Sequence, residues 1–225
     1  MIIAIDGPAG SGKSTVAREV ARRLGFTYLD SGAMYRAVTL AALDSGIDLD
    51  DGPALGRIAE RLGIELRRRE QDNVQVFVDG RDVSDAIREP RVTGASSRVA
   101  AHPDVRSAML DKQRTLIAAG DYVVEGRDIG TVVAPGAPVK AFLTADADER
   151  ARRRAAELER RGVSIQQDEV RSAIEQRDML DSTRSAAPLR KADDAELIDT
   201  TGLTADAVAD RIVALAERAR SASGR

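Results

Sequence analysis

The chain of 225 residues has no cysteine, no tryptophan and a single histidine. Without cysteine it cannot form disulfides, use a thiolate nucleophile or bind a metal through sulfur, and it fits a reducing compartment. The one histidine, His102, precedes Pro103 outside any recognisable catalytic pattern, and a solvated turn or the start of a helix is its ordinary role. The sequence therefore gives little support for a Ser-His-Asp catalytic triad.

Long apolar runs and an excess of basic residues are also absent. No run approaches the roughly 20 apolar residues that span a bilayer, and the start of the chain becomes acidic at Asp6, too soon for a signal peptide. The net charge is −3, without the basic excess typical of nucleic-acid binders. We expect a soluble, cytoplasmic protein that binds neither membranes nor nucleic acid.

Residues 7–14 read GPAGSGKS and match the phosphate-binding pattern Gly-x-x-x-x-Gly-Lys-Ser/Thr. The apolar residues 2–5 before them are typical of a strand buried on both faces, and Val16, Val20 and Leu24 after them are spaced as one face of a helix. Lys13 would reach the β and γ phosphates, and Ser14 would ligate Mg²⁺. Because motif, strand and helix agree, a chance glycine-rich turn is the weaker interpretation. We predict binding of ATP or GTP.

Short apolar runs alternate with longer helical patterns through most of the chain. After the first strand they are residues 27–29, 122–124, 139–143 and 197–198. Five strands with helices between them predict an α/β fold, in which a parallel sheet carries helices on both faces. Near the C-terminus, Thr204 is suited to cap a closing helix with an apolar stripe at Val208, Ile212 and Leu215.

One stretch breaks this alternation. Between Ile64 and Val83 the pattern has period two, and Asp79-Gly80 supplies a hairpin turn. We predict a small antiparallel piece inserted into the α/β chain. Such an insertion either shapes ligand recognition or merely decorates the fold, and the sequence alone leaves both open.

A charged segment, residues 148–161, interleaves arginines with glutamates. Most such helices are solvated faces held by pairs three or four residues apart. Arg150, Arg153 and Arg154 could also share one face, and an arginine cluster near an ATP-binding loop is a candidate for a closing lid. Both interpretations stay open.

Polar residues follow two of the predicted strands, in segments 30–36 and 125–128. Ligands of parallel sheets lie outside the carboxyl ends of the strands, so both segments should face the phosphate loop. Four arginines from these and later segments would supply the planar cations that phosphoryl transfer needs to hold an acceptor phosphate, namely Arg36, Arg127, Arg177 and Arg184.

Four segments together resemble the bacterial cytidylate kinase family. They are residues 7–15, 30–36 (DSGAMYR), 125–133 (EGRDIGTVV) and 177–189, and the match runs in order over nearly the whole chain. The resemblance implies a P-loop NTPase-type fold in one nucleoside monophosphate kinase domain over residues 1–225. Its parts would be a core (1–30, 111–145 and 171–225), a monophosphate-binding region (31–110) with the antiparallel insertion at about 62–92, and a short helical lid (146–170).

The resemblance also implies a reaction: transfer of the γ-phosphoryl group of ATP, bound with Mg²⁺, to CMP or dCMP. The implied catalytic residues are Lys13, Arg36, Arg127, Arg177 and Arg184. ATP would be bound by Gly7, Pro8, Ala9, Gly10, Ser11, Gly12, Lys13, Ser14, Thr15, Arg150, Arg153 and Arg154, with Ser14 as the metal ligand. The monophosphate would be bound by Ser31, Arg36, Ser97, Arg106, Arg127, Asp128, Arg177, Asp181 and Arg184.

Within that set, the resemblance implies that Ser97 and Arg106 read the cytosine edge and that Asp128 and Asp181 face the sugar hydroxyls. Two positions depart from the family pattern: Ser31 stands where many relatives have threonine, and Glu125 where many have aspartate. No second acidic anchor for Mg²⁺ is unambiguous. Either Asp30 or Glu125 would contact the water shell of the ion.

Two other functions fit the loop and the size of the chain. One is a kinase for another small molecule, such as adenylate or shikimate, because substrate choice rests on the insertion and on Ser97 and Arg106. The other is a nucleotide-dependent switch, although no Asn-Lys-x-Asp guanine motif is present and Arg36 and Arg127 would lack a purpose. We expect a monomer that acts on the small molecules ATP and CMP or dCMP.

Overall fold

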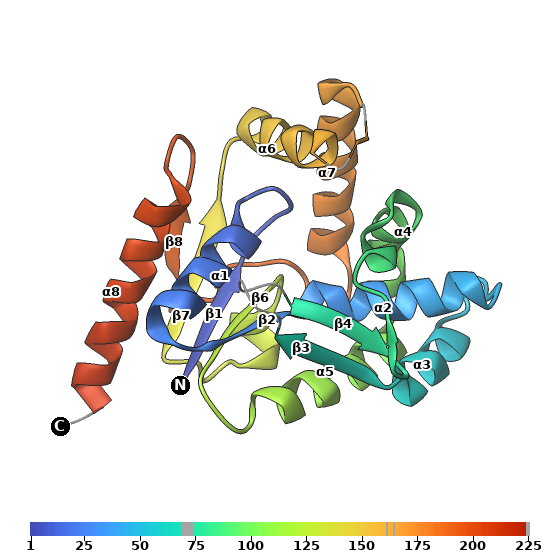
Figure 1. Ribbon diagram of the computed structural model, residues 1–225, viewed down its shortest axis with the longest axis horizontal. Coiled ribbons are helices and arrows are strands. Elements are labelled where there is room, and N and C mark those ends of the chain that lie inside the picture. Colours follow the sequence, from blue (N-terminus) through green and yellow to red (C-terminus); the bar gives the residue numbers. More distant parts are fainter. Residues whose placement is uncertain (69–73, 161, 164, 224–225) are drawn as a thin grey trace.

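A five-stranded parallel sheet forms the centre of the computed structural model, which describes residues 1–68, 74–160, 162–163 and 165–223 (Figure 1). The strands lie in the order β2-β6-β1-β7-β8, and every neighbouring pair is parallel. They are β1 (Ile2–Asp6), β2 (Thr27–Asp30), β6 (Tyr122–Gly126), β7 (Val139–Thr144) and β8 (Glu196–Asp199). All five predicted strands are confirmed.

Helices cover both faces of this sheet, as predicted. On one face α1 (Lys13–Leu24) and α8 (Ala205–Ser223) share a core with Ile3 and Ile5 of β1. On the other face Ala4 packs in a second core with Ile117, the last residue of α5 (Pro103–Ile117). Apolar side chains on both sides of β1 are what a strand between two helical layers requires. The Thr204 hydroxyl accepts from the backbone N–H of Ala207 at 3.2 Å, which confirms the cap of α8.

A second lobe carries its own apolar core. It contains α2 (Ser31–Asp44), α3 (Gly52–Arg61), the short helix η1 (Ala86–Arg88), α4 (Pro90–Ala100) and α5, together with an antiparallel sheet of β3 (Ile64–Arg68), β4 (Val74–Val78) and β5 (Arg81–Asp82). Asp79 and Gly80 have φ angles of 49° and 82°, the two positive values of a type I′ hairpin turn. The antiparallel insertion is confirmed, apart from residues 69–73, which lie outside the described residues.

Two helices, α6 (Ala147–Glu159) and α7 (Gln167–Thr183), pack against each other and project beyond the carboxyl ends of the strands (Figure 1). Acidic residues in the first turn of each helix complement its dipole. Residues 161 and 164 of the predicted lid lie outside the described residues. Among the described helices, none is both long and apolar enough to cross a membrane.

Candidate active site

The phosphate loop joins β1 to α1 in a conformation that needs its glycines. Gly7, Gly10 and Gly12 have φ angles of 148°, 75° and 89°, and a Cβ on Gly7 would lie 2.0 Å from the carbonyl oxygen of Leu143.

Lys13 is the first residue of α1, and its ammonium group donates to the Pro8 carbonyl at 2.6 Å and to Ser11 Oγ at 3.4 Å. Burial, with Arg127 close by, lowers the pKa of Lys13 to about 7. An anion in the loop would restore the full charge of this lysine.

The four predicted arginines contribute to an arginine cluster beside the loop, held by acidic side chains. Arg36 donates to Asp30 at 2.8 Å, and Arg127 donates to Asp181 at 2.9 Å. Within the described part of the chain, three buried guanidinium nitrogens have no hydrogen-bond partner: Nε of Arg36, Nε of Arg177 and Nη2 of Arg184. Burial, reinforced by the charge of Arg127, lowers the pKa of Arg177 to about 10. Unpaired buried donors of this kind suit the oxygens of a phosphate group.

Next to this cluster, Arg106 and Asp128 form a buried ion pair. Arg184 lies 3.6 Å from both Asp128 and Asp181, so the predicted base-reading and sugar-facing residues belong to one charge network. Arg106 also donates to the carbonyl of Ala100 at 3.2 Å. Ser97 is buried one turn before Ala100 on α4. The structure thus brings Arg106, Asp128, Asp181 and Arg184 together and places Ser97 on the adjoining helix.

Oxygen ligands suited to Mg²⁺ lie at the other end of the loop. Ser14 Oγ donates to Glu125 Oε2 at 2.9 Å, and the Tyr28 hydroxyl donates to the same carboxylate. Burial raises the pKa of Glu125, and the charge of Asp30 adds to this. A hydroxyl beside a carboxylate fits a hard cation. Since the described residues hold no cluster of three acidic, histidine or cysteine ligands, the ion would draw its other ligands from water and phosphate.

Asp30 is occupied elsewhere. Its Oδ1 accepts from the backbone N–H of Ala33 at 3.0 Å, which caps α2, while Oδ2 binds Arg36. Of the two acidic residues that the sequence offered for the Mg²⁺ water shell, only Glu125 contacts Ser14. The Ser31 hydroxyl also has a structural partner: it is buried and donates to the Glu125 carbonyl at 2.7 Å. This bond ties the start of α2 to β6.

Two arginines of α6 lie on the phosphate loop. Arg150 donates to the Ala9 carbonyl at 3.1 Å and pairs with Asp178 of α7. Arg153 donates to the hydroxyl and the carbonyl of Thr200, at 2.9 and 2.7 Å, and the Thr200 hydroxyl in turn donates to the Ser11 carbonyl at 3.2 Å. These two side chains are therefore not part of a solvated face.

The third predicted arginine of α6 behaves differently. Arg154 pairs with Glu157 of its own helix at 2.7 Å. Its charge still acts on Arg177 of α7, so it lies within electrostatic range of the arginine cluster.

A sequence model described as cytidylate kinase matches residues 3–218. The chain belongs to the cytidylate kinase family. It is 50% identical over 212 residues to a cytidylate kinase from Pelotomaculum thermopropionicum, covering 94% of both chains. It is 48% identical over 218 residues to one from Carboxydothermus hydrogenoformans, covering 97% of this chain and 98% of the relative.

Among solved structures, a gluconokinase from Sinorhizobium meliloti 1021 has the same fold as this member of the cytidylate kinase family. The TM-score is 0.50 at 16% identity, and the alignment covers 98% of this chain and 94% of the other. At such low identity the likeness concerns the fold alone.

Two acidic residues of this cytidylate kinase family member were not singled out from sequence. Asp6 accepts from the backbone N–H groups of Ile129 and Gly130, at 2.8 and 2.7 Å, and so fixes the segment that carries Arg127 and Asp128. Burial raises the pKa of Asp6 to about 6. Asp178 accepts from the Ala9 backbone N–H at 3.0 Å besides binding Arg150. The available signals were an acid at the end of a buried strand and an acid directly after Arg177.

Proposed function

We propose that this chain is a cytidylate kinase that transfers the γ-phosphoryl group of ATP to CMP or dCMP, giving ADP and CDP or dCDP. The single observation that carries the proposal is the arginine cluster: four guanidinium groups stand beside a phosphate loop in a member of this family, and within the described residues three of them have a buried nitrogen without a hydrogen-bond partner. The loop would bind the phosphates of the donor nucleotide and the cluster would bind the phosphate of the acceptor. This arrangement suits transfer of a phosphoryl group between two nucleotides.

On the donor side, the loop N–H groups and Lys13 would hold the β and γ phosphates of ATP. Ser14 and, through water, Glu125 would hold Mg²⁺. When bound, the ion would offset negative charge between the β and γ phosphates. Arg150 and Arg153 would fix the loop, and Arg154 would reach the nucleotide from the lid. Of the remaining loop residues, Thr15 is exposed at the first turn of α1 and would face the α phosphate.

On the acceptor side, the phosphate of CMP is an anion near neutral pH and can attack without a general base. Catalysis then reduces to alignment and charge compensation. This fits a chain whose only histidine stands at the N-cap position of α5 with its ring on the Leu49 carbonyl. Arg36, Arg127, Arg177 and Arg184 would hold the acceptor phosphate and stabilise the charge that spreads over the transferred group.

Base selection would rest on Ser97 and Arg106, as the resemblance implies. Because Asp128 is paired with Arg106 in the structure, we assign its carboxylate to the base instead of to the sugar, where the resemblance put it. Cytosine presents an amine donor at N4 and acceptors at N3 and O2. A carboxylate, a guanidinium group and a hydroxyl can satisfy all three. Asp181, held by Arg127 and Arg184, would face the sugar.

We further propose the division of the single domain given above: a core, a monophosphate-binding region over 31–110 and a lid over 146–170. Closure of the lid would exclude water, because a wet site would hydrolyse ATP. All residues named for the site come from one chain, so a monomer suffices for the reaction.

The proposal is tested by measuring ADP formation with Mg²⁺ and ATP while CMP, dCMP, UMP, AMP and GMP are offered separately. Rapid turnover with CMP and dCMP is expected. Turnover confined to AMP or GMP would overturn the roles of Ser97, Arg106 and Asp128, and steady hydrolysis of ATP without any acceptor would favour a nucleotide-dependent switch.

A further inference from the structure

Three side chains from separate elements form a hydrogen-bonded chain that ends at the phosphate loop. Tyr28 lies on β2, Glu125 on β6 and Ser14 in the first turn of α1. The phenol of Tyr28 donates to Glu125 Oε1, and Ser14 Oγ donates to Glu125 Oε2 at 2.9 Å. Both oxygens of one buried carboxylate are therefore held, one from each side.

The strand register explains why this contact forms. In the pairing of β2 with β6, Asp30 lies opposite Glu125 and Tyr28 lies opposite Val123. Alternate residues of a strand share a face, so Tyr28, Asp30 and Glu125 point to the same side of the sheet. Diagonal neighbours are within reach of long aromatic side chains. Asp30, the direct neighbour, is already bound to Arg36 and the start of α2.

The direction of the Ser14 bond matters for a cation. A hydroxyl has one hydrogen to donate and two lone pairs that accept. Because Ser14 gives its hydrogen to Glu125, its lone pairs remain available to an ion on the loop side. A glutamate has three rotatable bonds, so an unrestrained carboxylate would orient this hydroxyl poorly. The phenol of Tyr28 is protonated at neutral pH, so it acts as the donor to the carboxylate.

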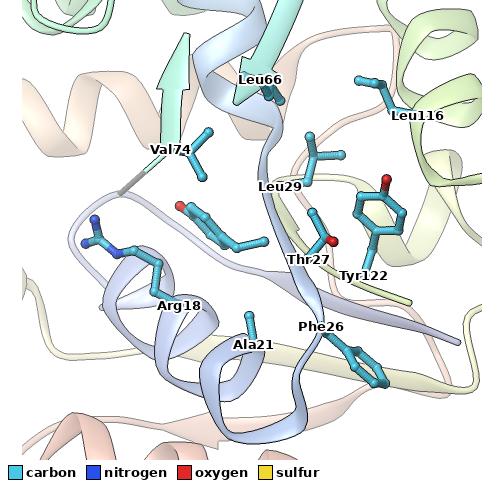
Figure 2. Close-up of a pocket in the computed structure, with 10 residues that line it drawn as sticks. Arg18, Ala21, Phe26, Thr27, Leu29, Leu66, Val74, Leu116 and Tyr122 are labelled. Carbon is cyan, nitrogen blue, oxygen red and sulfur yellow. The ribbon is translucent and has the colours of Figure 1, made fainter. Parts of the chain in front are cut away.

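The ring of Tyr28 has a different function from its hydroxyl. It lines an apolar pocket between α1, the edge of the sheet and the β3–β4 hairpin, together with Leu29, Leu66 and Tyr122. Figure 2 shows these neighbours, with Arg18 of α1 at one side. The ring also packs against the apolar core that contains Ile5 and Val123, and this contact holds it whether or not the hydroxyl is present. A phenylalanine at position 28 should keep the fold and lose only the bond to Glu125.

We propose that Tyr28 is a positioning residue for the Mg²⁺·ATP site, because its hydroxyl fixes the Glu125 carboxylate that orients the Ser14 hydroxyl. The inference deepens the proposed function and rests on it for the identity of the nucleotide. In this arrangement Tyr28 would act through Glu125 and would touch neither substrate nor ion. Its effect should therefore appear in the metal-dependent part of ATP binding and not in CMP binding.

The test compares the dissociation constant of ATP with and without Mg²⁺, measured by calorimetry on wild type, Tyr28→Phe and Tyr122→Phe. Tyr122 lines the same pocket and serves as the matched control. Loss of a hydrogen bond to a charged group predicts that Tyr28→Phe weakens Mg²⁺·ATP binding by about 10-fold. The dissociation constants of metal-free ATP and of CMP should stay near their wild-type values. The midpoint of thermal unfolding should fall by only a few degrees, and Tyr122→Phe should match wild type throughout.

A second variant separates positioning from general packing. In a Glu125→Ala background, Tyr28→Phe should cause no further loss of Mg²⁺·ATP affinity, because Tyr28 acts through that carboxylate. Equal weakening of ATP with and without Mg²⁺, or wild-type Mg²⁺·ATP affinity in Tyr28→Phe, would overturn the proposal. These measurements involve no phosphoryl transfer, so failure of wild type to phosphorylate CMP would contradict the proposed function and leave the Tyr28 result readable.

Discussion

Replacement of Arg127 by alanine should greatly lower kcat and should lower the free energy of unfolding only slightly. Arg127 follows β6 directly and donates to the buried carboxylate of Asp181 at 2.9 Å. In the proposed site its guanidinium group would stabilise the transferred phosphoryl group. Removal of one such preorganised cation predicts a fall in kcat of about 10²- to 10³-fold.

The loss of stability in Arg127→Ala depends on the cations that still lie beside Asp181. Burial opposes its charge, but Arg127, Arg177 and Arg184 together hold the pKa of Asp181 below its ordinary value. In the variant, Arg184 still lies 3.6 Å away, so we expect the free energy of unfolding at neutral pH to fall by only about 1–2 kcal/mol. A carboxyl with a lowered pKa stabilises the fold above its unfolded pKa and loses that contribution as the pH falls, so the variant should lose less stability on acidification than wild type.

The assay measures steady-state ADP formation at varied CMP, alongside denaturant unfolding. Arg152→Ala is the matched control, since this arginine of α6 is 64% exposed and pairs only with Glu149 of its own helix among the described residues. It should keep wild-type kcat. A kcat for Arg127→Ala within about threefold of wild type would refute the role of Arg127. So small a change corresponds to less than about 1 kcal/mol of activation free energy, which is far less than a cation on the transferred group should contribute.

Three further outcomes are expected. Gly7→Ala should destabilise the fold by at least about 3 kcal/mol in denaturant unfolding, because its Cβ would meet the Leu143 carbonyl at a φ of 148°. Gly80→Ala, in open space at a φ of 82°, should cost about 1 kcal/mol, and equal losses would contradict the packing argument. Arg106→Met should raise KM for CMP by about 100-fold and leave KM for ATP unchanged, and a matching rise in both would remove Arg106 from base selection. Burial raises the pKa of Asp6 to about 6, so this carboxyl binds more protons in the folded than in the unfolded protein between about pH 4 and 6. The free energy of unfolding of wild type, relative to Asp6→Asn, should therefore fall as the pH rises through that window and level off above it. A difference that does not change with pH would contradict the role of burial at Asp6.

The parts of the fold that depend on local sequence were predictable. The phosphate loop needs positive φ at Gly7, Gly10 and Gly12, and the run of small residues signals this directly. Asp79-Gly80 likewise predicts a type I′ turn by itself. The apolar runs predicted the strands because a parallel sheet buries both faces of each strand.

The finer arrangement of the site depends on register and packing that no local pattern encodes. Tyr28 meets Glu125 only because β2 pairs with β6 in one particular register. Asp178 binds the loop because α7 returns from the lid to lie over Ala9. The choice between Asp30 and Glu125 for Mg²⁺ was open for the same reason: Asp30 is taken by Arg36 and the cap of α2, which depends on the tertiary structure.

The most direct test follows the transferred group itself. Protein would be incubated with Mg²⁺, ATP labelled at the γ phosphate and CMP, and the products would be separated. We expect the label to appear in CDP, with little inorganic phosphate and no release in the absence of CMP. Label recovered only as inorganic phosphate, at a rate that CMP does not change, would contradict the central claim that the arginine cluster holds the acceptor.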